Sequence, residues 1–587
     1  MSDLNALEST HEVPLLLRSG RVFTGDELHP TATAVLVIAG RIEKVGTDEE
    51  LLGLIDSDAQ IIDVNGGLIT PGFIDAHIHP IYGGMERNAC DLTEADSHAG
   101  TLEAVQNYVA QRKAAETNNT DWIFGGGWYT GFFPSSGPTA KELDAVTANM
   151  PTYLISADHH SAWVNTAAMK LAGIRSQTPD PEDGVIERDA LGQPTGVLHE
   201  GAMDLLNHVL PPHSAEEYAA GLIAARDYLH SVGVTGWQDA ILGEYAGYPD
   251  VSETYRNARL TGTVAETVTG ALWVPRELTI ETVPSLVDEF VQRRQTNAHA
   301  GFTTHTAKIM VDGVPENKTA ALLEDYCRCD SLGMGRSPAA GEHDRGLTYL
   351  ERDVLMAVSV ALDAAGFDLH FHAIGDRAVR WSLDAIEETR RRNPAAAQRH
   401  HIAHIQIVHP DDVQRFGTVG ATANIQALWA AYDPQMLEHT IPQLGETRTS
   451  WQYPFSSIQQ SGGNLCMGSD WPVSSADPWQ AIHVAVNRTY PHVLDQTAAM
   501  NEPLELDEAI DLHTALKAYT SGSAWQLRLD RDYGRITPGA VANLAVANRN
   551  PFDDITSDQP TSICTTKNVL TIECGEIVYK AHRGQTS

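Results

Sequence analysis

The chain is poor in cysteine, with six in 587 residues. So few thiols cannot make the dense disulfide framework of a small secreted domain. Cys327 and Cys329 are too close together for an easy bridge, and they lack the second cysteine pair of a zinc knuckle. We therefore expect all six cysteines to be reduced, which favours a cytoplasmic location.

Long apolar runs are also missing. No run reaches the roughly 20 residues that a membrane-spanning helix needs. The first residues, Met1 to Ala6, include no basic stretch followed by an apolar one, so we expect no signal peptide. These two absences predict a cytoplasmic protein without a membrane anchor.

Positive charge is scarce, because 40 lysines and arginines face 77 aspartates and glutamates, for a net charge of -37. Such a surface repels phosphate groups, which argues against nucleic acid and against anionic membranes as partners. It favours a neutral or cationic small-molecule substrate. The simpler interpretation is that the acidity only keeps the surface soluble. The hydrophobic fraction of 42% is typical of an ordinary globular protein.

Both ends of the chain contain short strand-like segments between glycine-rich or charged turns. Ala34–Ile38 is an example near the start, and Val569–Glu573 is one near the end. Two β-rich ends around a different middle predict one small β-sandwich assembled from both termini. We expect residues 1–70 and 526–587 to form it.

The middle of the chain, residues 71–525, alternates strand-like and helix-like stretches, which predicts the α/β fold of a (β/α)8 TIM barrel. The candidate strands are Phe73–His79, Val234–Asp239, Gly262–Val268, His305–Val311, Phe367–Ala373, His401–Val408, Gly420–Gln426 and Asn464–Asp470. The gap after the first strand is too long for a loop. We therefore predict an inserted subdomain at about residues 80–230, which includes the Trp- and Gly-rich segment Asp121–Tyr129.

Candidate metal ligands stand at the ends of the predicted strands. His77 and His79 end the first strand, and side chains two apart on a strand point to the same side. Four later strands offer one candidate each: Lys308, His372, His404 and Asp470. Functional residues of such barrels lie at these carboxyl ends. In the fifth strand His370 shares a face with His372, so periodicity alone does not choose between them.

At these residues the sequence resembles the amidohydrolase superfamily. More narrowly, it resembles amidohydrolase family 3, with its N-substituted formamide deformylase-like and YtcJ-like metal-dependent hydrolases. The motifs that carry the resemblance are Pro71–His79, Asp158–Asn165, Lys308–Gly313, His372–Arg377, Gly468–Pro472 and Gly534–Gly539. One departure is Asn543, where the family usually has aspartate. Because Asn543 falls in the predicted small β domain, we do not expect it to alter the chemistry.

The resemblance implies a site for two divalent metal ions, with zinc expected and manganese or iron as alternatives. His77, His79 and Asp470 would hold the more buried ion, and His372 and His404 the other. Lys308 would bridge the two as a carbamate formed with carbon dioxide. A free ammonium has no lone pair, whereas a carbamate is an oxygen ligand that two cations can share.

The resemblance also implies a mechanism for amide hydrolysis. A hydroxide between the metals attacks the carbonyl carbon, and Asp470 carries its proton to the leaving nitrogen. His160, in the insert, would hydrogen-bond the oxyanion or the substrate. Together with Trp128 and Trp471, it is the predicted substrate-binding set. The aromatic insert suggests an apolar substituent on a small amide, such as an N-substituted formamide, and the resemblance is compatible with a homodimer.

Several alternatives stay open at this point. Lys308 could pair with Asp312 or Glu316 instead of bridging metals. A mononuclear deaminase, esterase or carbamate hydrolase on the same scaffold would not need this lysine. A non-catalytic regulatory protein that kept the barrel is a third reading, although it predicts that ligands have been lost, and all six are present.

Overall fold

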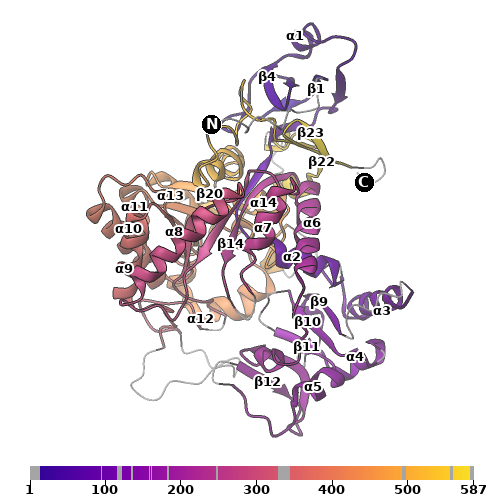
Figure 1. The fold of residues 1–587 in the computed structure, drawn as a ribbon, viewed down its shortest axis with the longest axis vertical. Helices are drawn as coiled ribbons and strands as arrows, with labels where there is room; N and C mark the ends of the chain where they lie inside the picture. The colour runs from indigo at the N-terminus through magenta and orange to yellow at the C-terminus, as the bar shows by residue number, and fades with distance from the viewer. Residues whose placement is uncertain are drawn as a thin grey trace.

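The chain folds around one central barrel, with a small β unit on one side and an inserted subdomain on the other (Figure 1). The computed structural model describes residues 13–581 apart from residues 94, 115–121, 134–136, 148, 158, 160, 182–183, 246–248, 317, 328–343, 492–497 and 556–559. Among the described residues, no helix is both long enough and apolar enough to cross a membrane.

Eight parallel strands form the barrel, in the spatial order β20-β19-β18-β17-β16-β15-β14-β7. They are β7 (Phe73–Ile78), β14 (Val234–Leu242), β15 (Val268–Trp273), β16 (Thr303–Met310), β17 (Asp368–Ala373), β18 (His401–His404), β19 (Thr422–Ile425) and β20 (Asn464–Met467). The segment after β20 nearly closes the barrel against β7. There the amide of Asp470 donates to the carbonyl of His77 at 2.8 Å, and the amide of His79 donates to the carbonyl of Trp471 at 2.9 Å. The predicted (β/α)8 fold is confirmed.

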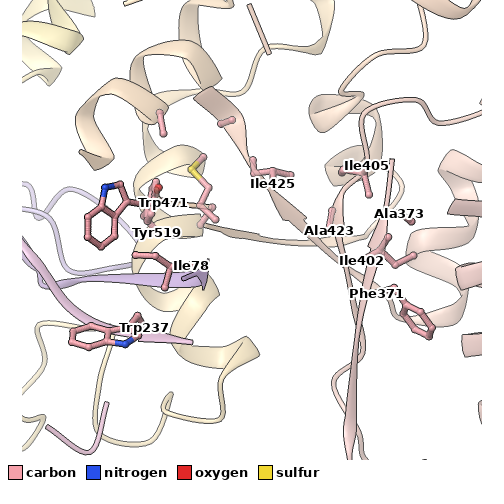
Figure 2. Packing of buried hydrophobic residues seen from close by; sticks show 14 of the residues in the cluster. Ile78, Trp237, Phe371, Ala373, Ile402, Ile405, Ala423, Ile425, Trp471 and Tyr519 are labelled. Atoms are coloured by element: carbon pink, nitrogen blue, oxygen red, sulfur yellow. The ribbon is translucent and has the colours of Figure 1, made fainter. Parts of the chain in front are cut away.

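Helices cover the outside of the barrel because each carries an apolar stripe at helical spacing. The connecting helices include α6 (Ala215–Ser231), α7 (Ser252–Leu260), α8 (Val283–His299), α9 (Arg352–Ala364), α10 (Asp376–Arg392), α11 (Pro410–Val419), α13 (Phe455–Gln460) and α14 (Pro478–Asn487). In α10, for example, Val379, Leu383 and Ile386 are buried. They belong to the same apolar cluster as Phe371 and Ile402, which are paired on neighbouring strands (Figure 2).

The third barrel strand lies later in the chain than predicted. The structure has it at Val268–Trp273, whereas the sequence favoured Gly262–Val268. The earlier segment is a turn that follows α7, and Gly262 adopts a positive φ of 70° there. The short apolar run that begins at Val264 therefore predicted the strand a few residues before its true start. Short apolar runs are ambiguous in this way.

The insertion after β7 contains its own six-stranded sheet, in the order β12-β13-β11-β10-β9-β8. Its strands are β8 (Cys90–Asp91), β9 (Ile123–Trp128), β10 (Thr152–Ser156), β11 (Ser161–Val164), β12 (Gly184–Arg188) and β13 (Pro194–Glu200). Trp128, Leu154 and Trp163 form part of a buried cluster within it. Helix α2 (Pro80–Asn88) leads from the barrel into the insert, and α6 leads back.

Two small sheets are built from the ends of the chain, the first from N-terminal strands alone and the second from strands of both ends. One has the order β4-β3-β1-β5, and the other has the order β2-β6-β21-β22-β23. Their bounds are β1 (Leu15–Arg18), β2 (Arg21–Val22), β3 (Ala34–Ile38), β4 (Arg41–Gly46), β5 (Gln60–Asp63), β6 (Leu68–Pro71), β21 (Leu544–Ala547), β22 (Asn568–Glu573) and β23 (Glu576–Lys580). Leu17, Val35 and Val546 share one buried cluster across them. The domain boundaries near residues 70 and 526 stay a prediction.

The predicted departure from the family, Asn543, lies next to β21. Its Oδ1 accepts the backbone N–H of Cys574 at 2.8 Å. Its own backbone carbonyl accepts the N–H of Gly72 at 2.8 Å. Asn543 therefore joins the two ends of the chain just before the barrel begins.

Candidate metal centre

Two histidines at the end of β7 meet one aspartate from the segment after β20. Nε2 of His77 lies 3.2 Å from Oδ1 of Asp470, and Nε2 of His79 lies 3.1 Å from the same oxygen. His77 is 1% exposed and Asp470 is 6% exposed. The backbone hydrogen bonds that close the barrel between these segments therefore also bring the three side chains to one point.

Asp470 adopts a backbone conformation that is uncommon for a residue with a side chain, with φ at 59°. His404 does so as well, with φ at 75°. Such conformations persist only when surrounding contacts impose them, and they concentrate at functional sites. Around Asp470 one of these contacts comes from buried Asp75, which accepts the backbone N–H groups of Ser469 and His77 at 3.0 and 3.1 Å. Burial raises the pKa of Asp75 to about 7.

Lys308 points from β16 toward the same place. Its Nζ lies 3.5 Å from Nε2 of His77, and the residue is 2% exposed. Burial lowers the pKa of Lys308 to about 7. Asp312 does not neutralise Lys308, because Asp312 instead accepts backbone N–H groups from Ala321, Ile374 and Gly375. The amine therefore lies beside the His77 imidazole, and the nearby charge of Asp470 only partly offsets the effect of burial on its pKa.

His372 and His404 form the second part of the site. Their ring centroids are 4.4 Å apart, and the ring of His404 lies 4.8 Å from that of His77. The other face of His404 stacks on Trp429, with the planes 3° apart. Nδ1 of His372 lies 3.4 Å from Oδ1 of Asp312. Asp312, held by three backbone amides, therefore places a carboxylate beside the His372 ring.

His370 lies beside His77 and not among the outer histidines. Its Nε2 is 2.9 Å from Nδ1 of His77, and its Nδ1 is 3.1 Å from Oε1 of Gln238 on β14. The ring of His370 also contacts that of His401, with centroids 3.9 Å apart. The structure thus separates two histidines that periodicity leaves equivalent. Gln238 carried no signal in the sequence, because a lone glutamine in an apolar strand is not a motif.

The residues present fit a divalent cation. Ligand atoms of His77, His404 and Asp470 lie within 4.8 Å of one another, among the residues that the structure describes. Oδ1 of Asp470 and both ring nitrogens of His404 are buried without a hydrogen-bond partner. Burial, together with the charge of Lys308, lowers the pKa of His77 to about 3, so its ring is neutral and keeps a lone pair. Neutral imidazoles beside a carboxylate are the ligands that zinc and related metals take.

The carboxylate of Asp470 is ionised in these surroundings. Burial by itself raises its pKa, but the imidazoles of His77 and His79 outweigh burial and hold the pKa well below the usual range. A buried carboxylate needs a positively charged partner, and a divalent cation coordinated by the same side chains would supply that charge.

Two of the three predicted substrate-binding residues, Trp128 and Trp471, lie in packed surroundings. His160 lies outside the described residues. Trp128 is 1% exposed, and its Nε1 donates to the carbonyl of Leu154 at 2.9 Å inside the insert. Trp471 is 6% exposed, and its ring lies 5.2 Å from that of Tyr228 on α6. The substrate contacts of all three stay predictions.

Comparisons with known proteins point to one family. Residues 60–579 match the sequence model of the amidohydrolase family. The chain is 28% identical to the N-substituted formamide deformylase of Arthrobacter pascens, over 93% of this chain and 95% of that protein. It is 27% identical to YtcJ of Bacillus subtilis (strain 168), over 96% and 98% of the two chains. It is 28% identical to Protein LONG AFTER FAR-RED 3 of Arabidopsis thaliana, over 94% and 90%.

The fold also matches solved structures. An uncharacterised metal-dependent hydrolase from Pyrococcus horikoshii OT3 superposes with a TM-score of 0.65 at 23% sequence identity, covering 92% of this chain and 98% of that one. This likeness shows a shared fold.

Proposed function

Because the chain belongs to the amidohydrolase family, as its motifs predict, we propose that it is a metal-dependent hydrolase cleaving a non-peptide amide C–N bond in a small molecule. The convergence of His77 and His79 on Asp470 carries this proposal. The similarity to an N-substituted formamide deformylase supports formamides and related amides with an apolar substituent as substrates.

We assign the metal ligands as follows. His77, His79 and Asp470 would hold the more buried ion, and His372 and His404 would hold the other. Lys308, as a carbamate, would be a ligand to both ions. When bound, divalent ions of this kind lower the pKa of water and polarise a substrate carbonyl, and zinc is the expected metal.

The lysine can form this carbamate without another catalyst. The lone pair of its neutral amine forms a C–N bond to the carbon of carbon dioxide, one C–O π bond breaks to give the carbamate oxygen anion, and the nitrogen gives up one proton to water. Burial, which lowers the pKa of Lys308 to about 7, supports the step because a large part of the amine is neutral near pH 7. The position of Nζ beside His77 supports it as well.

Asp470 is the residue that moves the proton. Its carboxylate accepts a proton from the attacking water and delivers it to the leaving nitrogen. Its φ of 59° holds the side chain at this point of the barrel mouth. The buried walls around it exclude bulk water, which strengthens every charge interaction at the site.

A substrate panel tests the proposed reaction. Protein purified with zinc is assayed against N-substituted formamides, other amides, carbamates, esters and dipeptides, and release of the amine is followed. We expect formamides or small amides to be hydrolysed and dipeptides to be poor substrates. Metal-loaded protein that hydrolyses no member of the panel would contradict the proposal and favour a regulatory role.

Metal counting tests the assignment of Lys308. Elemental mass spectrometry measures the zinc bound per chain. We expect two zinc ions per chain in the parent protein and about one in Lys308→Ala. The matched control is Lys318→Ala, because Lys318 follows β16 outside the strand and its Nζ lies 3.5 Å from Oδ2 of Asp344. One ion per chain in both the parent and Lys308→Ala would instead indicate a mononuclear enzyme.

A further inference from the structure

Arg276 lies at the rim of the barrel, three residues after the end of β15. Its guanidinium carbon is 3.8 Å from the ring centroid of Tyr349 and 5.4 Å from that of Tyr245. Its Nη2 is 3.4 Å from the hydroxyl of Tyr245 and 2.9 Å from Sδ of Met310. Two aromatic rings and a thioether therefore hold the planar guanidinium in one orientation.

Met310 connects this arginine to the candidate metal centre. Met310 and Lys308 are two apart on β16, so they point to the same side of the strand. Lys308 faces His77, and the next position on that face is about 7 Å further toward the barrel mouth. The guanidinium thus contacts the side chain that follows Lys308 on the same side of β16.

The arginine has unused donors. Its Nε is buried without a hydrogen-bond partner, and a thioether is only a weak acceptor. Among the residues that the structure describes, no carboxylate pairs with Arg276. Some other arginines of this acidic chain do pair with carboxylates: Nη2 of Arg293 lies 2.8 Å from Oδ2 of Asp250.

We propose that Arg276 binds a carboxylate on the substrate. On this proposal, which rests on the proposed function, the substrates are N-substituted amides whose apolar substituent carries a carboxylate a few atoms from the scissile carbonyl. A guanidinium can hold both carboxylate oxygens at once. The net charge of -37 disfavours anions only at long range, because salt screens charges beyond about 8 Å, whereas this contact is direct.

A pair of substrates tests the proposal: N-formylphenylalanine and N-(2-phenylethyl)formamide, which differ only in the carboxylate. We expect kcat/KM of the parent protein to favour N-formylphenylalanine by about 10- to 100-fold, the range for a hydrogen bond to a charged group. Arg276→Gln should bring the ratio close to one, and Arg276→Lys should lower it part of the way. Arg391→Gln is the matched control, because Arg391 is exposed and pairs with Glu388 at the far end of α10.

Binding measurements separate this proposal from the proposed function. Titration calorimetry measures the binding of 3-phenylpropanoate and of 3-phenylpropanamide to the parent protein and to Arg276→Gln. The circular dichroism spectra of the two proteins should be the same, which shows that the variant is folded. Preferential binding of the carboxylate that is lost in Arg276→Gln supports the proposal even if neither formamide is hydrolysed. Hydrolysis of both formamides at equal kcat/KM by the parent would overturn it and leave the proposed reaction intact.

Discussion

Nε2 of His370 lies 2.9 Å from Nδ1 of His77, directly behind the candidate metal centre. Nδ1 of His370 faces Oε1 of Gln238, which can only accept, so His370 donates there. Its Nε2 is then free to accept the N–H on Nδ1 of His77. Nε2 of His77 is left with a lone pair that faces Asp470, so the relay from Gln238 selects the tautomer that binds a metal.

Replacing His370 should therefore weaken metal binding, although His370 is not assigned as a ligand. We expect His370→Ala to lower zinc affinity by about 10- to 100-fold, the usual effect of losing the partner of a ligating histidine. Competition with a chromogenic chelator measures the affinity. His299→Ala is the control, because His299 is an exposed residue at the end of α8. Unchanged affinity in His370→Ala would show that the relay does not matter.

The proton-transfer role of Asp470 predicts a large loss of rate with little loss of structure. We expect Asp470→Asn to reduce kcat by about 10²- to 10⁴-fold. Asparagine tolerates the left-handed backbone conformation at this position, so the melting temperature without added metal should change little. Asp411→Asn, at a side chain that is 83% exposed, should retain full activity. If Asp470→Asn kept the kcat of the parent protein, Asp470 would not be the proton carrier.

Asp312 should matter for stability as well as for the site. Its carboxylate accepts backbone N–H groups from Ala321, Ile374 and Gly375 at 2.8, 3.0 and 2.8 Å. Asp312→Ala leaves these buried donors unpaired, which should lower the free energy of unfolding by about 3 kcal/mol or more. Urea unfolding measures the change, and Asp411→Ala should shift it by less than about 0.5 kcal/mol. A loss as small as the control's would mean that water or a local rearrangement satisfies the amides.

Asp433 predicts how stability changes with pH. Burial, together with the charge of Glu316, raises the pKa of Asp433 to about 6. A carboxyl group with a raised pKa favours its protonated form in the fold, so its ionisation costs stability as pH rises from about 4 to about 6. The cost is at most about 2 kcal/mol, because the side chain is partly exposed.

Asp433→Asn should remove this cost, since its Oδ1 can still accept the N–H of Met436, as Asp433 does at 2.7 Å. We expect the variant to be more stable than the parent at pH 7 and equal to it at pH 4, by urea unfolding at both values. Unfolding profiles that run parallel across this pH range would show that the pKa of Asp433 is not raised.

The sequence by itself determined the architecture and the candidates. The alternation of strands and helices predicted the barrel, because strand and helix periods are local properties of the chain. The spacing of His77 and His79 was enough to place both at one strand end. The predicted position of the third strand was wrong, because the sequence pattern does not show on which side of a turn an adjacent strand begins.

Periodicity left His370 and His372 equivalent and the family resemblance chose His372, but only the tertiary structure shows what separates them. The two side chains share one face of β17, so their local patterns are identical, and depth in the barrel separates them. That depth depends on how β17 is aligned with β7, which places His370 against His77 and His372 against His404. The contacts that Gln238, Asp312 and Met310 make with the residues around the candidate metal centre could not be predicted from the sequence, for the same reason. Contacts between distant strands follow from the closure of the sheet, and no local period encodes that closure.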